Sequence, residues 1–273
     1  MNVETPIPIV DGVVPASETT SSWQVVAAVV RGVRHEASGI PCQDACHWRM
    51  ASEGVLIAAV ADGASSAAHS EIGSAVATQA AIDTLCAVQC LTDDPHDLTR
   101  WEQHLTEALK AAVIAIQNEA DSRQLPVRDL ATTLILVIAT PQVTVAVQIG
   151  DGAVVVGDRN GKLIALTSPL VGDYVNETDF LCSPNLLKIA QGRYWPIAPR
   201  FVAIFSDGLQ RLALQMPEAD PHPGFFSPLF KFVSETTEPS SAEDQLKTFL
   251  QSPRLRARTD DDTTLLLAHL PGE

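Results

Sequence analysis

The chain has 273 residues, of which 46% are hydrophobic, and its formal net charge is −15 at pH 7. This length and apolar content are enough for one large domain with a substantial core. The acidic balance argues against unaided binding to nucleic acid or to an anionic membrane surface, and no stretch reaches the ~18 apolar residues of a membrane span.

The first 21 residues carry three prolines and a Ser/Thr cluster, which predicts a flexible N-terminal arm. The acidic start lacks the basic region of a secretory signal peptide, so we expect a cytoplasmic protein. The five cysteines fit free thiols in that compartment. We expect residues 22–273 to form a single domain.

Strands and helices follow the arm in runs. Apolar strands are expected over residues 22–32 and 54–62, and helices over about 70–89 and around 98–116. Four strands then alternate with turns over 132–139, 143–149, 153–158 and 162–167, followed by an irregular region over 168–199. A strand over 201–206, helices over 229–235 and 242–251, and a strand over 261–270 end the chain. This order predicts an α+β fold with mainly antiparallel sheets covered by helices.

Three of the apolar strands end in the dipeptide Asp-Gly. The stretches are LIAAVADG ending in Gly63, VAVQIGDG ending in Gly152 and FVAIFSDG ending in Gly208. Asp-Gly is a strong hairpin signal, and this interpretation stays open for Asp151, which has strand-like sequence on both sides. It fits Asp62 and Asp207 less well, because helix-like sequence follows them.

A carboxylate at the end of a buried strand needs a partner, because an unpaired buried charge is costly. Several such carboxylates at neighbouring strand ends would repel one another, and a divalent cation would remove that repulsion. Glycine beside the aspartate lets the backbone approach closely and offer a carbonyl oxygen. The pattern therefore favours a metal site.

Six short motifs occur in a fixed order along the chain: QDA at 43–45, ADG at 61–63, ATT at 131–133, GDG at 150–152, SDGL at 206–209 and DDTT at 261–264. Together they resemble the type 2C metal-dependent Ser/Thr protein phosphatases, in a compact bacterial-like version. The resemblance spans roughly residues 23–269. It implies an α-β-β-α sandwich with the metal site between the two sheets at one end.

The resemblance also implies roles for individual residues. Asp62 would bridge two Mn²⁺ or Mg²⁺ ions, and the carbonyl of Gly63 would bind one of them. Asp207 and Asp261 would complete the first-metal site with Asp62, and Asp44 would lie close to the second ion. A water activated by the two ions would be the nucleophile, so no cysteine or serine is expected to attack.

Asp151 matches a family position that is linked to a weaker third ion. Similar phosphatases often carry an aspartate where this chain has Arg211, and that aspartate helps to hold the third ion. Arg211 could replace this ion electrostatically by pairing with Asp151, or it could point to solvent. The pairing is our prediction.

The chain departs from the family pattern at several positions. Gln43 stands where a glutamate is common, and Ala64 stands where eukaryotic members often have a histidine. The phosphate-binding arginine normally lies just before the first acidic motif, but the nearest basic residues here lie further upstream. We expect Arg34 or His35 to contact phosphate, and the alternative is that both are solvated loop residues.

The expected function is hydrolysis of phosphoserine and phosphothreonine in a phosphoprotein, such as a Ser/Thr kinase or its target, by a monomeric enzyme. One alternative is a phosphatase-like regulatory module that binds a phosphoprotein without turning it over. Another is a hydrolase of small phosphate esters. The irregular segment over 168–192 is expected to border the site and to contribute to substrate choice.

Overall fold

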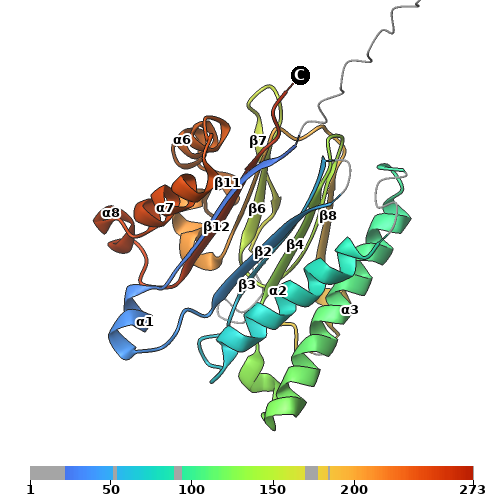
Figure 1. The fold of residues 1–273 in the computed structure, drawn as a ribbon, viewed down its shortest axis with the longest axis vertical. Helices are drawn as coiled ribbons and strands as arrows, with labels where there is room; N and C mark the ends of the chain where they lie inside the picture. The colour runs from blue at the N-terminus through green and yellow to red at the C-terminus, as the bar shows by residue number, and fades with distance from the viewer. Residues whose placement is uncertain (1–21, 52–53, 89–93, 170–177, 184, 273) are drawn as a thin grey trace, which may run out of the picture.

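Two five-stranded antiparallel sheets lie face to face in the structure, with helices covering both outer faces (Figure 1). The computed structural model describes residues 22–51, 54–88, 94–169, 178–183 and 185–272. The first sheet has the order β1 (Gln24–Val30), β12 (Thr263–His269), β9 (Phe201–Phe205), β6 (Ala153–Gly157) and β7 (Leu163–Thr167). The second has the order β2 (Asp44–Ala51), β3 (Val55–Asp62), β4 (Leu134–Ala139), β5 (Thr144–Ile149) and β8 (Gln191–Trp195). This architecture confirms the predicted α+β sandwich.

Helices α2 (Ser70–Cys86) and α3 (Leu98–Arg123) cover the second sheet, and α6 (Pro223–Ser234) and α7 (Pro239–Leu250) cover the first (Figure 1). Short elements complete the fold: α1 (Val33–Ser38), α4 (Leu186–Ile189), α5 (Gln210–Ala213), α8 (Pro253–Arg256), the 3-10 helices η2 (Val127–Leu130) and η3 (Asp207–Leu209), and the strand pair β10 (Leu214–Gln215) and β11 (Asp220–Pro221). No helix in these described ranges is long and apolar enough to cross a membrane.

The apolar runs of the sequence are explained by burial on both faces of each sheet. In β3, Ile57 and Ala59 pack toward α2 and α3, whereas the alternate residues Leu56 and Ala58 pack between the sheets. A strand covered on both faces reads as continuously apolar rather than alternating. Three apolar layers result, one between the sheets and one under each helix pair.

Several elements differ from the sequence expectation, and one difference bears on the site. Strands β5 and β6 belong to different sheets, so Asp151 and Gly152 lie on a crossover between the sheets. The hairpin interpretation of that Asp-Gly pair is therefore wrong. Between the expected strands over 22–32 and 54–62, the structure has α1 and β2. The irregular region over 168–199 contains β8. The arm predicted for residues 1–21 lies outside the described residues.

Candidate active site

Acidic residues from both sheets occupy strand ends at one end of the sandwich. Asp44, the first residue of β2, is paired in register with Asp62, the last residue of β3. Directly opposed residues in an antiparallel pair have their Cβ atoms about 4.5–5.5 Å apart. From the other sheet, Asp207 follows β9 after one residue and Asp261 precedes β12 by two. We call Asp44, Asp62, Asp207 and Asp261 the strand-end carboxylates.

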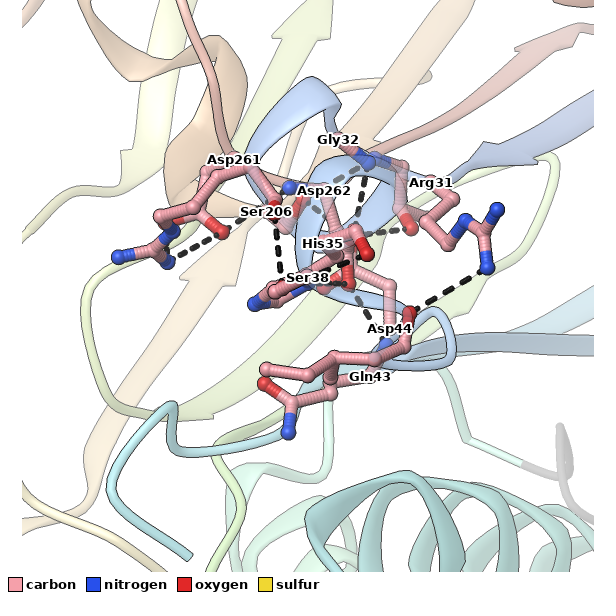
Figure 2. Close-up of polar contacts among 12 residues, drawn as sticks. Arg31, Gly32, His35, Ser38, Gln43, Asp44, Ser206, Asp261 and Asp262 are labelled. Carbon is pink, nitrogen blue, oxygen red and sulfur yellow. Dashed lines mark hydrogen bonds and ion pairs between the residues drawn. The ribbon is translucent and has the colours of Figure 1, made fainter.

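Hydroxyl groups tie Asp44 to the opposite sheet. The Oγ of Ser206 and the Oγ1 of Thr264 each donate a hydrogen bond to Oδ2 of Asp44, both at 2.7 Å. Ser206 Oγ also accepts a hydrogen bond from the backbone N–H of Thr264 at 3.0 Å. The bonds to Asp44 connect the two sheets at the site. Figure 2 shows the positions of Ser206 and Asp44.

Two threonines hold the backbone of Asp62. The N–H of Asp62 donates to Oγ1 of Thr133 at 2.9 Å, and the carbonyl of Asp62 accepts from the N–H of Thr133 at 2.8 Å. Oγ1 of Thr132 donates to the same carbonyl at 2.9 Å. The ATT motif therefore positions the end of β3.

Burial, together with crowded negative charge, raises the pKa of three carboxyl groups. Burial raises the pKa of Asp44 to about 7, with the charges of Asp262 and Asp207 adding to the effect and its hydroxyl partners opposing it. Burial and the neighbouring Asp44 and Asp207 charges raise the pKa of Asp62 well above its usual value. Burial and the charge of Asp151 raise that of Asp207 to about 6. The site therefore favours positive charge.

The donor set fits a hard divalent cation. Oδ1 of Asp44 and Oδ1 of Asp207 are buried without a hydrogen-bond partner among the described residues, and carboxylate oxygens are the ligands that Mg²⁺ and Mn²⁺ prefer. A Cβ atom on Gly63 would lie 2.7 Å from Ser70 Oγ, and one on Gly208 would lie 2.0 Å from a backbone oxygen. Only glycine fits the close backbone packing beside Asp62 and Asp207.

Two of the strand-end carboxylates, Asp261 and Asp44, form hydrogen bonds with other side chains. Arg34 Nη2 donates to Oδ1 and Oδ2 of Asp261 at 3.0 and 3.1 Å, and these side chains are 46% and 36% exposed. Asp44 is held by its hydroxyl partners. Within the described ranges, no three His, Cys, Asp or Glu side chains are grouped to hold a metal ion. The strand-end carboxylates therefore lie at the same end of the sandwich without forming a closed cage.

A family model for protein phosphatase 2C matches residues 31–251 of this chain. The serine/threonine-protein phosphatase 3 of Escherichia coli (strain K12) is 35% identical over 254 residues, which cover 90% of this chain and 98% of that protein. The chain belongs to the protein phosphatase 2C family. Membership confirms the resemblance carried by the six motifs and makes the chain a protein phosphatase with phosphoprotein substrates.

Solved bacterial structures share the protein phosphatase 2C fold of this chain. The serine/threonine phosphatase Stp1 from Staphylococcus aureus matches with a TM-score of 0.62 at 15% identity and covers 93% of this chain and 96% of its own. PppA, described as a key regulatory component of T6SS in Pseudomonas aeruginosa, matches with a TM-score of 0.59 at 18% identity, covering 92% and 99%. At these identities the likeness concerns the fold alone.

In this protein phosphatase 2C chain, the two residues expected to contact phosphate point in different directions. Arg34 stands half-exposed at the rim, beside Asp261. His35 is buried, and its Nδ1 lies 3.0 Å from Oδ2 of Asp262. A buried imidazole in that position cannot meet an incoming phosphate, so only Arg34 remains a candidate for phosphate binding.

Asp262, for which the sequence pattern predicts no role, anchors the segment that leads into Asp44. Its Oδ1 accepts the N–H of Gly32 at 2.7 Å and its Oδ2 accepts the N–H of Gln43 at 2.6 Å. Figure 2 shows Gly32, His35 and Gln43 gathered around this carboxylate. The run of three aspartates at 260–262 indicates that one carboxylate could have a structural role. It does not indicate which of the three side chains points inward.

Asp151 lies near Asp207, since its charge contributes to the raised pKa of that carboxyl. Oγ1 of Thr178 donates to Oδ2 of Asp151 at 2.9 Å, and the N–H of Leu181 donates to the carbonyl of Thr132 at 2.9 Å. Residues 178–181, in the middle of the 168–192 segment, therefore lie against Asp151 and Thr132. The earlier part of that segment, residues 170–177, lies outside the described residues.

The predicted pairing of Arg211 with Asp151 is not found in the part of the chain that the structure describes. Arg211 is exposed and lines a groove beside α6. Its position on α5 turns the guanidinium toward that groove, whereas Asp151 is bound by Thr178 on the crossover between the sheets.

The raised pKa values predict that the metal-free chain loses stability as pH rises from about 4 to about 7. An aspartate has a pKa near 3.9 in the unfolded chain. In the folded chain the pKa is about 7 for Asp44 and about 6 for Asp207. These carboxyl groups therefore bind protons more tightly in the folded state. The free energy of unfolding therefore falls as they ionise. Thermal unfolding in chelator from pH 5 to 8 measures this.

A matched Asp207→Asn variant isolates the contribution of the site from other titrating groups. We expect its melting temperature to exceed that of the wild type by a margin that grows with pH. A margin that shrinks with pH would show that ionised Asp207 is stabilised by the fold instead of repelled.

Proposed function

We propose that the chain hydrolyses phosphoserine and phosphothreonine in proteins, using Mn²⁺ or Mg²⁺ held by the strand-end carboxylates. The carrying observation is that these four residues lie at strand ends of both sheets, at the same end of the sandwich, in a protein phosphatase 2C chain. Burial and neighbouring negative charge raise the pKa of three of them, Asp44, Asp62 and Asp207. We assign two ions to Asp44, Asp62, Asp207, Asp261 and the carbonyl of Gly63, and a weaker third to Asp151. When bound, the ions would supply Lewis-acid activation of water and charge neutralisation of the phosphoryl group.

The chain's own residues would orient the ligands and the substrate. The hydroxyls of Ser206 and Thr264 restrain Oδ2 of Asp44, which leaves its buried Oδ1 available as a ligand. Arg34 would bind the phosphate at the rim, because a planar guanidinium matches phosphate oxygens in a two-pronged arrangement. Its present contact with Asp261 supports this role.

The cysteines support a mechanism without a thiol nucleophile. Burial raises the pKa of the Cys46 thiol to about 12, and burial together with Asp44 and Asp262 raises that of Cys42 still further. Cys86 and Cys182 also have raised pKa values, mainly through burial. A catalytic cysteine needs a lowered pKa to be a thiolate near pH 7, and these four thiols show the opposite.

The purified chain is expected to cleave an aryl phosphate and phosphothreonine peptides with Mn²⁺ or Mg²⁺, and to stop when the ions are chelated. The reason is that the crowded carboxylates cannot activate water or accept a phosphate dianion without added positive charge. Release of inorganic phosphate against free Mn²⁺ concentration measures this. Turnover in chelator, with metal content verified as absent, would refute the mechanism.

The same assay separates the alternatives. Tight phosphopeptide binding without turnover under any metal condition would favour the regulatory binding module. A chain that cleaves aryl phosphate but not phosphopeptides, and that phosphopeptides do not inhibit, would be a hydrolase of small phosphate esters.

A further inference from the structure

An apolar groove of about 660 Å³ lies between α6, α7 and α8, on the outer side of the first sheet. The ring centroids of Phe225 and Phe249 are 6.4 Å apart, and the Phe249 side chain, at 39% exposure, is accessible to a ligand. We call this feature the α6–α7 groove. Its apolar lining includes Leu212, Phe225, Pro228, Leu229, Phe232 and Phe249.

Arginines border the same groove. Arg211, Arg254 and Arg258 line it and are exposed, and none of their guanidinium groups has an ion-pair partner in the residues that the structure describes. The neighbouring Arg256, by contrast, is paired with Glu36 at 2.8 Å. The chain as a whole carries 33 acidic and only 18 basic side chains. Three unpaired arginines around one apolar groove are therefore a local reversal of the overall charge.

The groove lies beside the candidate active site along the chain. Arg211 follows Asp207 by four residues, and Arg258 precedes Asp261 by three. A chain spans at most about 3.3–3.6 Å per residue. The Cα atoms of Asp207 and Arg211 therefore lie within roughly 14 Å of each other, and those of Arg258 and Asp261 within roughly 11 Å. A peptide with its phosphorylated residue in the site can therefore reach the groove with about four further residues.

We propose that the α6–α7 groove docks a segment of the phosphoprotein substrate that combines apolar side chains with carboxylates and lies at least four residues from the phosphorylated residue. Apolar side chains would fill the space between Phe225 and Phe249. Carboxylates of the same segment would pair with the guanidinium groups of the arginines that border the groove. This inference rests on the proposed function and assigns a substrate class to the same site.

Direct binding tests the proposal independently of catalysis. A fluorescent, unphosphorylated peptide containing Glu, Asp, Leu and Phe should bind the full chain in chelator, and fluorescence anisotropy measures its Kd. Arg254→Glu combined with Arg258→Glu should weaken binding about tenfold or more, and Phe249→Ala about fivefold. The matched surface variants Arg159→Glu and Leu98→Ala should leave it unchanged. Equal effects of groove and control variants would overturn the proposal.

Kinetics then connect docking to the reaction. A phosphothreonine peptide extended by the acidic and apolar segment should have a KM about tenfold lower than the bare phosphopeptide, with kcat within twofold. The groove variants should abolish this advantage while cleaving an aryl phosphate normally. If wild type cleaves every substrate but gains nothing from the segment, the docking proposal fails alone. If it cleaves none with Mn²⁺, the proposed function fails, whatever the peptide binding shows.

Two other occupants of the groove would also be revealed. Residues 1–21, the expected N-terminal arm, carry Glu4, Asp11 and Glu18 and no lysine or arginine. If the peptide binds only after these three are replaced by Gln, Asn and Gln in the full chain, the arm occupies the groove and the proposal is overturned. A shift from dimer to monomer on charge reversal of Arg254 and Arg258, seen by sedimentation, would likewise assign the groove to a second copy.

Discussion

Replacing Asp62 or Asp207 by asparagine is expected to lower phosphopeptide turnover about 100-fold or more. Each side chain contributes a carboxylate to the site between the sheets, and an amide keeps the shape but removes the ligand charge. Two-metal sites act by clamping the reacting oxygens, so losing one charged ligand affects the clamp directly. Asp62 also lies where the end of β3 is held by two threonines, which should preserve the local backbone in the variant.

The two variants should also unfold at a higher temperature than the wild type when metal is removed. The raised pKa values of Asp62 and Asp207 reflect the cost of burying a negative charge and the repulsion between neighbouring carboxylates. Asparagine carries no charge, so both costs are removed. Phosphate release and thermal unfolding in chelator measure the two effects, with the exposed Asp244→Asn as the matched control. Near-wild-type turnover in both site variants would show that the active site is elsewhere.

Asp262→Ala is expected to lower the free energy of unfolding by about 3 kcal/mol. The substitution leaves the buried N–H groups of Gly32 and Gln43 without an acceptor and removes the carboxylate beside His35. Because Gln43 immediately precedes Asp44, turnover should also fall, by about tenfold or more. Chemical denaturation followed by fluorescence measures the stability change.

Asp260→Ala supplies a control from the same run of three aspartates. The Asp260 side chain is exposed, and its backbone carbonyl, which accepts the N–H of Arg34 at 3.1 Å, is unchanged by the substitution. This variant should unfold within about 0.5 kcal/mol of wild type. Equal losses at positions 260 and 262 would contradict the anchoring role of Asp262.

The fold class could be predicted because its main signals are local. A strand such as β3 is buried on both faces and therefore reads as an apolar run, and α3 repeats its buried residues at helical spacing. Sheet membership is not local. Strands β5 and β6 adjoin in sequence around Asp151 but pair with different partners. Asp-Gly suits a hairpin and a crossover equally well, so only the long-range pairing decides between them.

The candidate site was partly predictable for the same reason. Asp62, Asp151 and Asp207 were found because each ends an apolar strand, and the motif order added Asp44 and Asp261. Which residues of a short polar run turn inward depends on tertiary packing.

His35 and Asp262 illustrate this limit. Each is buried against the other, while their sequence neighbours Arg34 and Asp261 pair at the rim. Adjacent residues on a tight helix and in a loop point to different sides, and nothing in the local sequence distinguishes the inner pair from the outer.

The central claim is that the strand-end carboxylates bind the divalent cations on which turnover depends. Calorimetric titration of the metal-free full chain with Mn²⁺ tests it most directly. The account predicts tight binding of about two ions by the wild type, and loss of at least one of them in Asp62→Asn and in Asp207→Asn, but not in Asp244→Asn. Identical Mn²⁺ binding curves for the wild type and both site variants would contradict it.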